Sequence, residues 1–157
     1  MSSPGREALV RRALPDEAEA LNAVVVRSKG YWGYAQPVVE AYRSFLSLGP
    51  EKIEQSPVYC AEVGGAIVGV SHFNTVGQAE VELFHLFVDP AFIGRGIGTL
   101  LWRHAVDRAR SMGATALVFD SDPHARPFYE RMGAVVVGDH SSTVVDGLRI
   151  PRMRYEL

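Results

Sequence analysis

The sequence is poor in the features that mark several large classes of protein. It holds a single cysteine, Cys60, so no disulfide can form within the chain, and the apolar run around it is typical of a small buried side chain. No apolar run approaches the roughly 20 residues that cross a bilayer. Residues 1–7 lack the apolar core of a signal peptide. We therefore expect a cytoplasmic protein with no membrane partner.

The chain also lacks an excess of charge of either sign. It has 16 Lys and Arg residues and 18 Asp and Glu residues, a formal net charge of −2 at pH 7. This balance gives no support to nucleic acid as a partner. We find no repeat, linker or low-complexity segment. At 157 residues we expect one domain, residues 1–157, with a core that needs neither disulfides nor a metal.

The most informative stretch runs from residue 80 to residue 112 and reads as a strand, a glycine turn and a helix. Residues 81–88 are almost all apolar or aromatic and end at Asp89-Pro90, which predicts a buried strand. After the glycines the apolar residues recur with the spacing of a helix, which predicts a helix with one apolar stripe. The residues of this stripe are Leu101, Ala105, Ala109 and Met112.

Three alternate glycines, Gly94, Gly96 and Gly98, stand where this helix begins. They leave the backbone uncovered, so several N–H groups can converge on one anion with the helix dipole behind them. The pattern predicts a phosphate site. The alternative is a tight turn that binds nothing.

Two nucleotide motifs can be compared with this turn. A P-loop requires a lysine that is absent here. The dinucleotide fingerprint Gly-x-Gly-x-x-Gly fits Gly94 and Gly96, and Asp120 stands where a ribose-binding acid is expected, but Thr99 occupies the third glycine position. A dinucleotide such as NAD is therefore the weaker alternative.

Two blocks of sequence resemble the GNAT superfamily of N-acetyltransferases. Residues 86–90, Leu-Phe-Val-Asp-Pro, followed by Ile-Gly-Arg-Gly-Ile-Gly at residues 93–98, are similar to the family's strand end and its Gln/Arg-x-x-Gly-x-Gly/Ala turn. Residues 122–134, which include Ala125, Tyr129 and Gly133, are similar to the family block Asn-x-x-Ala-x-x-x-Tyr-Glu-x-x-Gly-Phe. The order and separation of the two blocks make the resemblance specific.

The resemblance implies an enzyme that transfers the acetyl group of acetyl-CoA to a primary amine, directly and within a ternary complex. In the family the glycine turn holds the pyrophosphate, and a backbone N–H at the strand end binds the thioester carbonyl. The cofactor-binding residues implied here are Leu86, Phe87, Val88, Ile93, Gly94, Arg95, Gly96, Ile97, Gly98, Thr99, Asp122, Ala125 and Phe128. No metal is implied.

Two positions depart from the family pattern. Ile93 replaces the usual Gln or Arg, which removes a charge-assisted contact worth about 1.5 to 3 kcal/mol, although Arg95 and Thr99 can add contacts. Asp122 replaces the usual Asn, so it either contacts the cofactor or only caps the following helix.

Glu82 is the first candidate for the general base, because it resembles in position the base of acetyltransferases that act on histone lysines. The alternative is a structural carboxylate paired with an arginine. Strict alternation along the strand places residues 80, 82, 84 and 86 on one face and residues 81, 83, 85 and 87 on the other. His85, the rival base, should then face away from Glu82, which favours a core histidine.

Tyr129 matches the family tyrosine assigned as general acid beside the CoA sulfur. Full proton transfer from a phenol of pKa about 10 to a thiolate of pKa about 8.5 is uphill by about 2 kcal/mol, so a hydrogen bond to the thiolate is sufficient. The alternative is a core tyrosine.

Residues 28–34 hold three aromatic residues among glycines, a pattern too irregular for a helix or a strand. The resemblance places this stretch at the acceptor cleft, so we expect Tyr31, Trp32 and Tyr34 to form a wall of the substrate pocket. The alternative is aromatic packing beneath a loop. The stretch favours a small-molecule amine acceptor over a macromolecule. The sequence does not indicate an oligomeric state, although members of the family that it resembles often form dimers, which makes a homodimer an alternative to a monomer. A non-catalytic acyl-CoA-binding module is the alternative function.

The remaining pattern predicts an α/β (α+β) fold with a mixed, mostly antiparallel sheet of about seven strands and about four helices on its two faces; by resemblance this is the GNAT fold. A short helix ending at residue 132 starts at Pro123 or Pro127. The other predicted elements are strands at 9–13, 58–63, 66–73, 116–119, 134–137 and 148–157, helices at 15–27 and 37–48, a turn at 74–78 and a polar loop at 139–142.

Overall fold

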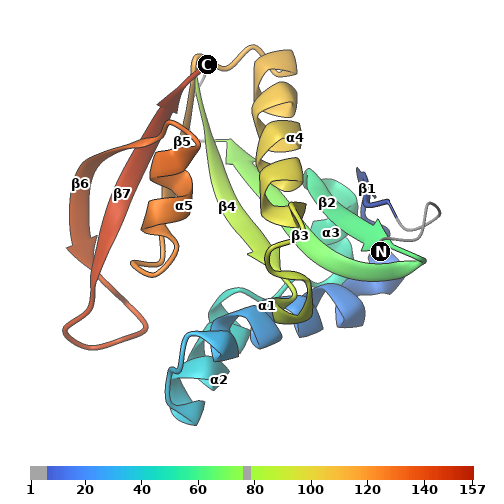
Figure 1. Cartoon of the computed structure of the whole chain (residues 1–157), viewed down its shortest axis with the longest axis horizontal. Coiled ribbons are helices and arrows are strands. Elements are labelled where there is room, and N and C mark those ends of the chain that lie inside the picture. The colour runs from blue at the N-terminus through green and yellow to red at the C-terminus, as the bar shows by residue number, and fades with distance from the viewer. Residues whose placement is uncertain (1–6, 76–78) are drawn as a thin grey trace.

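The computed structural model describes residues 7–75 and 79–157, which form a seven-stranded sheet flanked by helices (Figure 1). The strands are β1 (Leu9–Arg12), β2 (Val58–Val63), β3 (Ala66–Thr75), β4 (Glu80–Val88), β5 (Ala116–Asp120), β6 (Val135–Ser141) and β7 (Arg149–Glu156). The helices are α1 (Ala18–Tyr31), α2 (Gln36–Phe45), α3 (Pro50–Gln55), α4 (Ile97–Ser111) and α5 (Arg126–Arg131), with 3-10 turns η1 (Pro15–Glu17) and η2 (Pro90–Phe92). Residues 1–6 of the segment compared with a signal peptide, and 76–78 of the predicted turn, lie outside the described residues.

The sheet has the order β1-β2-β3-β4-β5-β7-β6. Every neighbouring pair is antiparallel except β4 and β5, which run parallel. That pairing extends only from Glu80↔Ala116 to Glu82↔Val118. Beyond it the two strands diverge, as Figure 1 shows. The expected mixed, mostly antiparallel sheet is confirmed, and it is split into two halves at its centre.

Strand β4 carries a β-bulge at Phe84. His85 pairs with His72 of β3, whereas Leu83 pairs with the next residue, Phe73, so Phe84 is an extra residue between them. The predicted strict alternation is therefore wrong. Leu83 and, beyond the bulge, Leu86 both pack toward the core under α4, whereas His85 turns to the face covered by α1 and α2.

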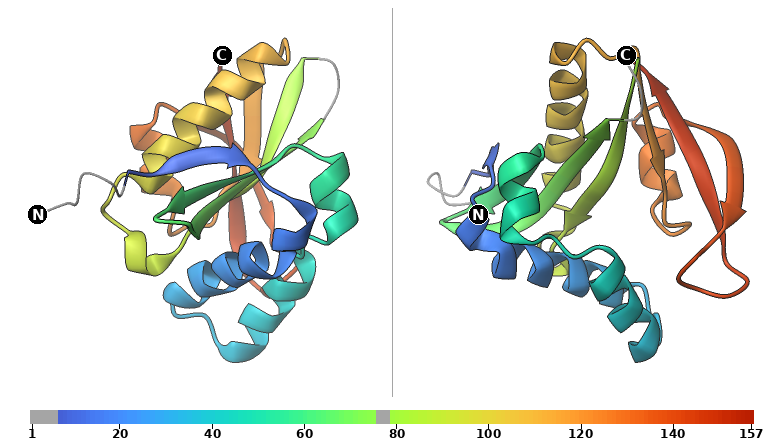
Figure 2. Two further views of the ribbon diagram at one scale, coloured as in Figure 1. Left: turned by 90° about the vertical axis from the view of Figure 1, so that its right-hand side faces the viewer. Right: turned by 180° about the vertical axis from the view of Figure 1, so that it is seen from behind.

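Helices cover both faces of the sheet, as Figure 2 shows. On one face, Trp102 and Ala105 of α4 pack against Leu83, and Tyr129 of α5 joins the same cluster. On the other face, residues of α1, α2 and α3 pack against β2 and β3; the buried ones among them include Leu21, Val25, Tyr42 and Ile53. In the described parts of the chain, no helix has the length and apolarity needed to cross a bilayer.

Two predicted helix boundaries are wrong. Helix α1 continues to Tyr31 through Gly30, so residues 28–31 are helical and not part of a loop. A glycine costs a helix interior about 1 kcal/mol, and the burial of Leu21, Val24 and Val25 of the same helix opposes this cost. Helix α2 ends at Phe45, before the predicted end at residue 48, and α3, a helix that was not predicted, begins at Pro50.

The C-terminal half differs from the prediction in three places. Helix α5 begins at Arg126, so Pro127, and not Pro123, stands in its first turn. Strand β6 continues to Ser141 because Asp139 pairs with Pro151 of β7, so most of the predicted polar loop at 139–142 is strand. The short turn η2, which sequence periodicity does not indicate, brings the chain from β4 into the glycine turn.

Candidate active site

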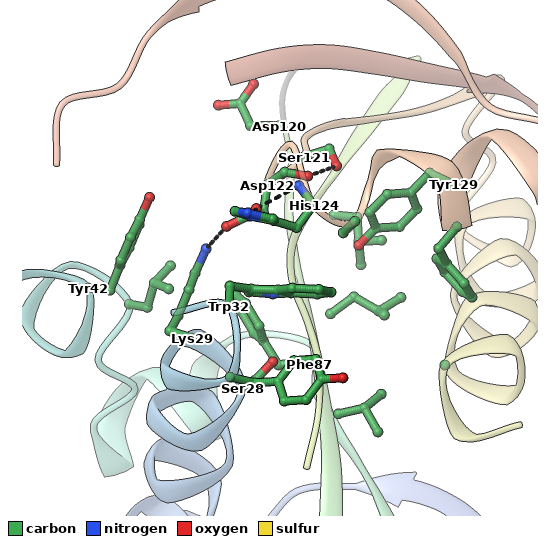
Figure 3. A pocket seen from close by; sticks show the side chains of 18 of the residues that line it. Ser28, Lys29, Trp32, Tyr42, Phe87, Asp120, Ser121, Asp122, His124 and Tyr129 are labelled. Atoms are coloured by element: carbon green, nitrogen blue, oxygen red, sulfur yellow. Dashed lines mark hydrogen bonds and ion pairs between the residues drawn. The ribbon is translucent and has the colours of Figure 1, made fainter. Parts of the chain in front are cut away.

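A pocket of about 680 Å³ lies where β4 and β5 diverge (Figure 3). Its lining comes from β4, from the ends of α1 and α2, from the turn before α4, from the β5–α5 connection and from the β6–β7 connection. Between Leu83 and Val88 the edge of β4 that faces β5 has no strand partner among the described residues. Backbone groups on this edge are therefore available to a ligand.

The glycine turn forms one end of the pocket. Gly94 and Gly96 have φ angles of +82° and +79°, a left-handed conformation that other residues adopt only with strain. The first hydrogen bond of α4 joins Leu100 N–H to Gly96 O at 3.0 Å. The amides of Ile97 and Gly98 precede it and have no intrahelical partner. The turn is thus a set of free donors at the positive end of a 15-residue helix, a fit for a phosphate anion.

Most of the predicted cofactor-binding residues line this pocket. They are Leu86, Phe87, Val88, Ile93, Gly94, Gly96, Ile97, Gly98, Thr99, Asp122, Ala125 and Phe128. Arg95 does not; its guanidinium lies 5.0 Å from the centre of the Phe92 ring. An amide cradle, an apolar wall and a free strand edge meet in one cavity, an arrangement that suits the pyrophosphate and pantetheine arm of CoA.

Tyr129 lies on α5 with its ring in the core and its hydroxyl directed toward the pocket (Figure 3). The ring packs against Phe119, with centroids 4.5 Å apart. Burial, and then the negative charge of Asp122, raise the pKa of the phenol. Tyr129 therefore stays protonated, and its hydroxyl is available to the pocket as a hydrogen-bond donor.

Glu82 lines the pocket and is paired with an arginine, as the structural alternative expected, and its role as general base stays a prediction. Its Oε2 accepts a hydrogen bond of 2.8 Å from Nη1 of Arg152 on β7, and the same nitrogen bonds Asp120 at 3.1 Å. Arg152, which the motifs did not point to, thus joins two carboxylates across the diverging strands.

His85 is buried and does not line the pocket. Its Nε2 lies 2.9 Å from Leu46 O, and its Nδ1 lies 3.2 Å from Nδ1 of His72. Burial lowers its pKa to about 4. It is a core histidine, as favoured, but the reason given was wrong: the bulge at Phe84 turns His85 toward the face that Glu82 occupies.

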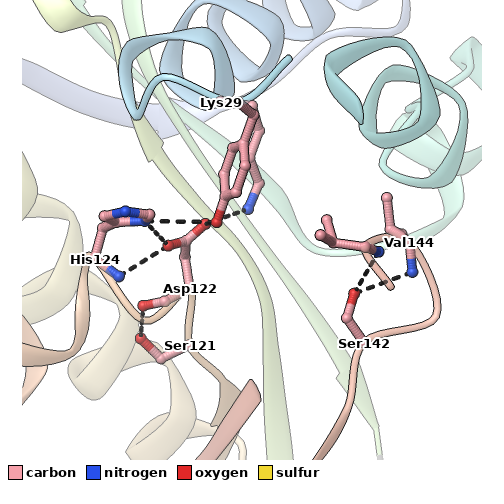
Figure 4. A network of polar contacts seen from close by, with 8 residues as sticks. Lys29, Ser121, Asp122, His124, Ser142 and Val144 are labelled. Carbon is pink, nitrogen blue, oxygen red and sulfur yellow. Dashed lines mark hydrogen bonds and ion pairs between the residues drawn. The ribbon is translucent and has the colours of Figure 1, made fainter. Parts of the chain in front are cut away.

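A buried ion pair that sequence reasoning missed joins α1 to the β5–α5 connection (Figure 4). Lys29 Nζ lies 3.1 Å from Asp122 Oδ2, and the side chains of both residues are 8% exposed. The ammonium also lies 4.1 Å from the centre of the Tyr42 ring. Burial lowers the pKa of Lys29, while the Asp122 charge offsets part of that effect. The only signal was a charged residue within the aromatic stretch at residues 28–34.

Asp122 is held by four hydrogen-bond donors (Figure 4). Oδ2 accepts from Lys29 and, at 2.8 Å, from the Tyr34 hydroxyl. Oδ1 accepts from the backbone N–H of His124 at 2.9 Å and contacts His124 Nδ1 at 2.8 Å. Burial opposes ionisation of Asp122, but Lys29 and these hydrogen bonds outweigh it and lower its pKa. Asp122 therefore caps the turn that precedes α5 and carries a fixed negative charge.

The three predicted aromatic residues divide into two roles. Tyr31 and Trp32 line the pocket. Trp32 stacks on the His124 ring with centroids 5.0 Å apart and an interplanar angle of 11°. Tyr34 does not line the pocket and instead positions Asp122 through its hydroxyl. Aromatic residues not predicted for the site, Tyr42, Phe45 and Phe84, complete this wall.

The model of the acetyltransferase (GNAT) family matches residues 26–134. Because the match covers more than half of the 157 residues, the chain belongs to the GNAT family, and the resemblance seen in the two motif blocks is confirmed.

Curated relatives share part or most of the chain. The glucosamine 6-phosphate N-acetyltransferase of Trypanosoma brucei brucei is 32% identical over 82 residues, which cover 48% of this chain and 56% of that enzyme. The 5-NmdU N-acetyltransferase of Pseudomonas phage PaMx11 is 27% identical over 132 residues, which cover 83% of this chain and 89% of that protein. The chain thus spans about half the length of the trypanosomal enzyme.

Solved structures share the fold over the whole chain. The GCN5-related N-acetyltransferase "Aminotransferase, Class-II" from Rhodopseudomonas palustris has a TM-score of 0.81 and 23% sequence identity, covering 100% of both chains. The PaiA N-acetyltransferase from Thermoplasma acidophilum, in complex with coenzyme A, has a TM-score of 0.77 and 16% identity, covering 96% of this chain and 99% of that one. The fold of this chain is the GNAT fold. Within the described residues, no group of three or more His, Cys, Asp or Glu residues is placed to hold a metal ion.

Proposed function

We propose that this chain is an N-acetyltransferase that moves the acetyl group of acetyl-CoA onto a primary amine. The observation that carries the proposal is that one pocket joins the amide cradle at the start of α4 to the unpaired edge of β4 and then to an aromatic chamber. Family membership and the coenzyme A held by a structural neighbour support the choice of donor. The curated relatives carry N-acetyltransferase names.

Each part of the pocket has a distinct role in the proposed reaction. The amides of Ile97, Gly98 and Thr99 hold the pyrophosphate. A backbone N–H near Phe87 or Val88 donates to the carbonyl oxygen as negative charge develops there. Bound acetyl-CoA supplies the activated acetyl group and a thiol leaving group. The Tyr129 hydroxyl, kept protonated by its raised pKa, donates a hydrogen bond to the departing sulfur.

Direct transfer in a ternary complex is favoured over a covalent acetyl-enzyme. Cys60 is fully buried in β2 and is not part of the pocket lining. Burial raises the pKa of its thiol to about 11, so the nucleophilic thiolate is scarce.

We propose a small-molecule amine as the acceptor. The chamber beyond the unpaired edge of β4 is walled by Trp32, Tyr42 and Phe84, a surface suited to an apolar body of limited size. Glu82 and Asp120 line the same pocket and share the single positive charge of Arg152, and the net negative charge that remains favours a cationic amine.

Calorimetric titration of the purified protein with acetyl-CoA, with NAD as the comparison, tests the donor. Micromolar binding of acetyl-CoA alone is expected; preference for NAD, or no binding, would overturn the proposal. A thiol-release assay over a panel of primary amines then separates an enzyme from an acyl-CoA-binding module, because a binding module takes up acetyl-CoA without releasing thiol.

A further inference from the structure

Acetyl transfer needs a group that removes a proton from the attacking amine, and the two candidates expected from the sequence are both engaged elsewhere. His85 lies in the core with a partner on each ring nitrogen. The Glu82 carboxylate is neutralised by Arg152 at 2.8 Å. A third titratable group, His124, stands in the pocket itself with its side chain 44% exposed.

The contacts of His124 determine which ring nitrogen carries the proton. Nδ1 lies 2.8 Å from Asp122 Oδ1, a carboxylate oxygen that can only accept, so Nδ1 must carry the hydrogen. In the neutral ring Nε2 then holds a lone pair. Nε2 makes no hydrogen bond to any other residue that the structure describes.

The carboxylate that orients His124 is itself rigid and ionised. Lys29 and Tyr34 hold its other oxygen at 3.1 and 2.8 Å, and the lowered pKa of Asp122 keeps it charged. The ring plane is set independently by the Trp32 stack. Tyr34 adds an edge contact to the ring, with centroids 5.6 Å apart at 82°. An imidazole held in one tautomer and one orientation, with its basic nitrogen free, is the arrangement of a positioned general base.

We propose that Nε2 of His124 is the general base for the acceptor amine, with Asp122 and Trp32 as positioning residues. This rests on the acetyl transfer proposed above. The ammonium form of the acceptor first loses one proton to solvent. As the nitrogen forms its bond to the acetyl carbon, Nε2 takes the second N–H proton, and the C–S bond then breaks. The thiolate finally receives a proton from the imidazolium through solvent, so His124 returns to its neutral form.

The groups around the ring are one carboxylate, one ammonium and one phenol, and they do not all favour the imidazolium. Asp122 contacts Nδ1 directly and stabilises the imidazolium that forms during the step. Lys29, on α1, reaches the ring only through Asp122, which it neutralises in part. The Tyr34 hydroxyl lies 3.5 Å from Nδ1 and donates to the same carboxylate.

The hydrogen-bonded pair of His124 and Asp122, called the dyad below, can be tested without any ligand. Nitrogen-15 NMR of the full chain labelled at its five histidines reports the tautomer of each ring, and the spectrum of His124→Gln assigns the His124 signals. We expect the Nδ1–H tautomer for His124 and its loss in Asp122→Asn. An Nε2–H tautomer in the unsubstituted protein would overturn the proposal, whether or not acetyl transfer is found.

Kinetics with the fastest amine from the thiol-release panel test the proton transfer. His124→Gln should lower kcat about 100-fold, remove the acidic limb of the pH profile and leave acetyl-CoA affinity by calorimetry within about twofold. His104→Gln and Asp107→Asn, on α4 and outside the pocket lining, are the matched controls for His124→Gln and Asp122→Asn.

Glu82→Gln in the same assay separates the two bases. We expect it to retain the acidic limb and to lose less rate than His124→Gln. If His124→Gln keeps kcat within about threefold with an unchanged pH profile, the proposal is wrong. If the unsubstituted protein binds no acetyl-CoA, the proposed function fails instead, and the NMR result still decides the state of the dyad.

Discussion

The Nδ1 atoms of His72 and His85 lie 3.2 Å apart in the interior of the protein, so one ring donates its proton to the other. His85 Nε2 faces the carbonyl of Leu46 and must carry a hydrogen, which makes its Nδ1 the acceptor. His72 is therefore the donor through Nδ1. Its Nε2 is buried and has no hydrogen-bond partner among the described residues. The pair fits together only when both rings are neutral.

This pair predicts a loss of stability in acid. Burial lowers the pKa of His72 to about 3 and that of His85 to about 4. The unfolded chain binds protons at both histidines below pH about 6.5, while the folded protein does not. The free energy of unfolding should therefore fall as the pH decreases from about 6.5 toward 4, by up to about 1.4 kcal/mol per pH unit for each histidine.

Urea unfolding at pH 7.5, 6.0 and 5.0 measures this dependence. His72→Phe removes one of the two groups and should reduce the slope of unfolding free energy against pH. A slope that is unchanged in His72→Phe would contradict the assignment to this pair.

The ion pair of Lys29 and Asp122 should be strongly coupled. Lys29→Met leaves a buried carboxylate without its cation and should lower the free energy of unfolding by about 3 kcal/mol. In Lys29→Met/Asp122→Asn no charge remains unpaired, so the double variant should be more stable than the sum of the two single changes indicates. Denaturant midpoints of the four proteins form the cycle. Additive effects would show that the two charges do not stabilise each other.

Gly96 should be intolerant of a side chain for backbone reasons alone. An added Cβ would meet no atom within 4 Å, but the φ angle is +79°. Gly96→Ala should therefore lower stability by about 1 to 2 kcal/mol and weaken acetyl-CoA binding in calorimetry, because the amides of the turn move. Gly138→Ala is the matched control, since its site is equally open and its φ angle is not positive. Equal effects of the two substitutions would refute the strain argument.

The Tyr129 hydroxyl should affect rate more than affinity. Tyr129→Phe keeps the ring in the core and removes only the donor to the leaving sulfur. A hydrogen bond to a charged group is worth about 1.5 to 3 kcal/mol, so kcat should fall about 10- to 100-fold while acetyl-CoA affinity is retained. Because burial raises the pKa of this phenol, the variant should not alter an alkaline limb below pH about 10. Tyr155→Phe, whose ring packs on Trp102 away from the pocket lining, is the control. A fall in affinity with unchanged kcat would place Tyr129 in binding alone.

The parts of the site predicted from sequence are those formed by residues close together in the chain. The glycine turn at residues 94–98 is local, because the positive φ angles and free amides depend on a short segment. The spacing of the apolar residues and the positions of the turn residues likewise predicted the seven strands. In contrast, Lys29 and Asp122 are 93 positions apart, and only the packing of α1 beside the β5–α5 connection brings them together. No local sequence pattern indicates that contact.

The errors at β4 and α1 have different physical origins. Around Phe84 both neighbours are apolar or aromatic, so hydrophobic alternation carries no sign of the extra residue. At Gly30 helix propensity argued for a break, but tertiary packing decided the conformation. Hydrophobic alternation predicts the orientation of side chains least well where a strand is apolar on both faces.

The bulge at Phe84 makes the length of β4 as important as its composition. Removing Phe84 would make Leu83 and His85 consecutive, as their partners Phe73 and His72 are, so the side chains on both sides of the deletion would keep the faces that they occupy now. An insertion of one residue elsewhere in β4 would instead turn every following side chain of the strand to the opposite face. Such an insertion should therefore cost more stability than the deletion of Phe84, because it exchanges the surfaces that face α4 and α1.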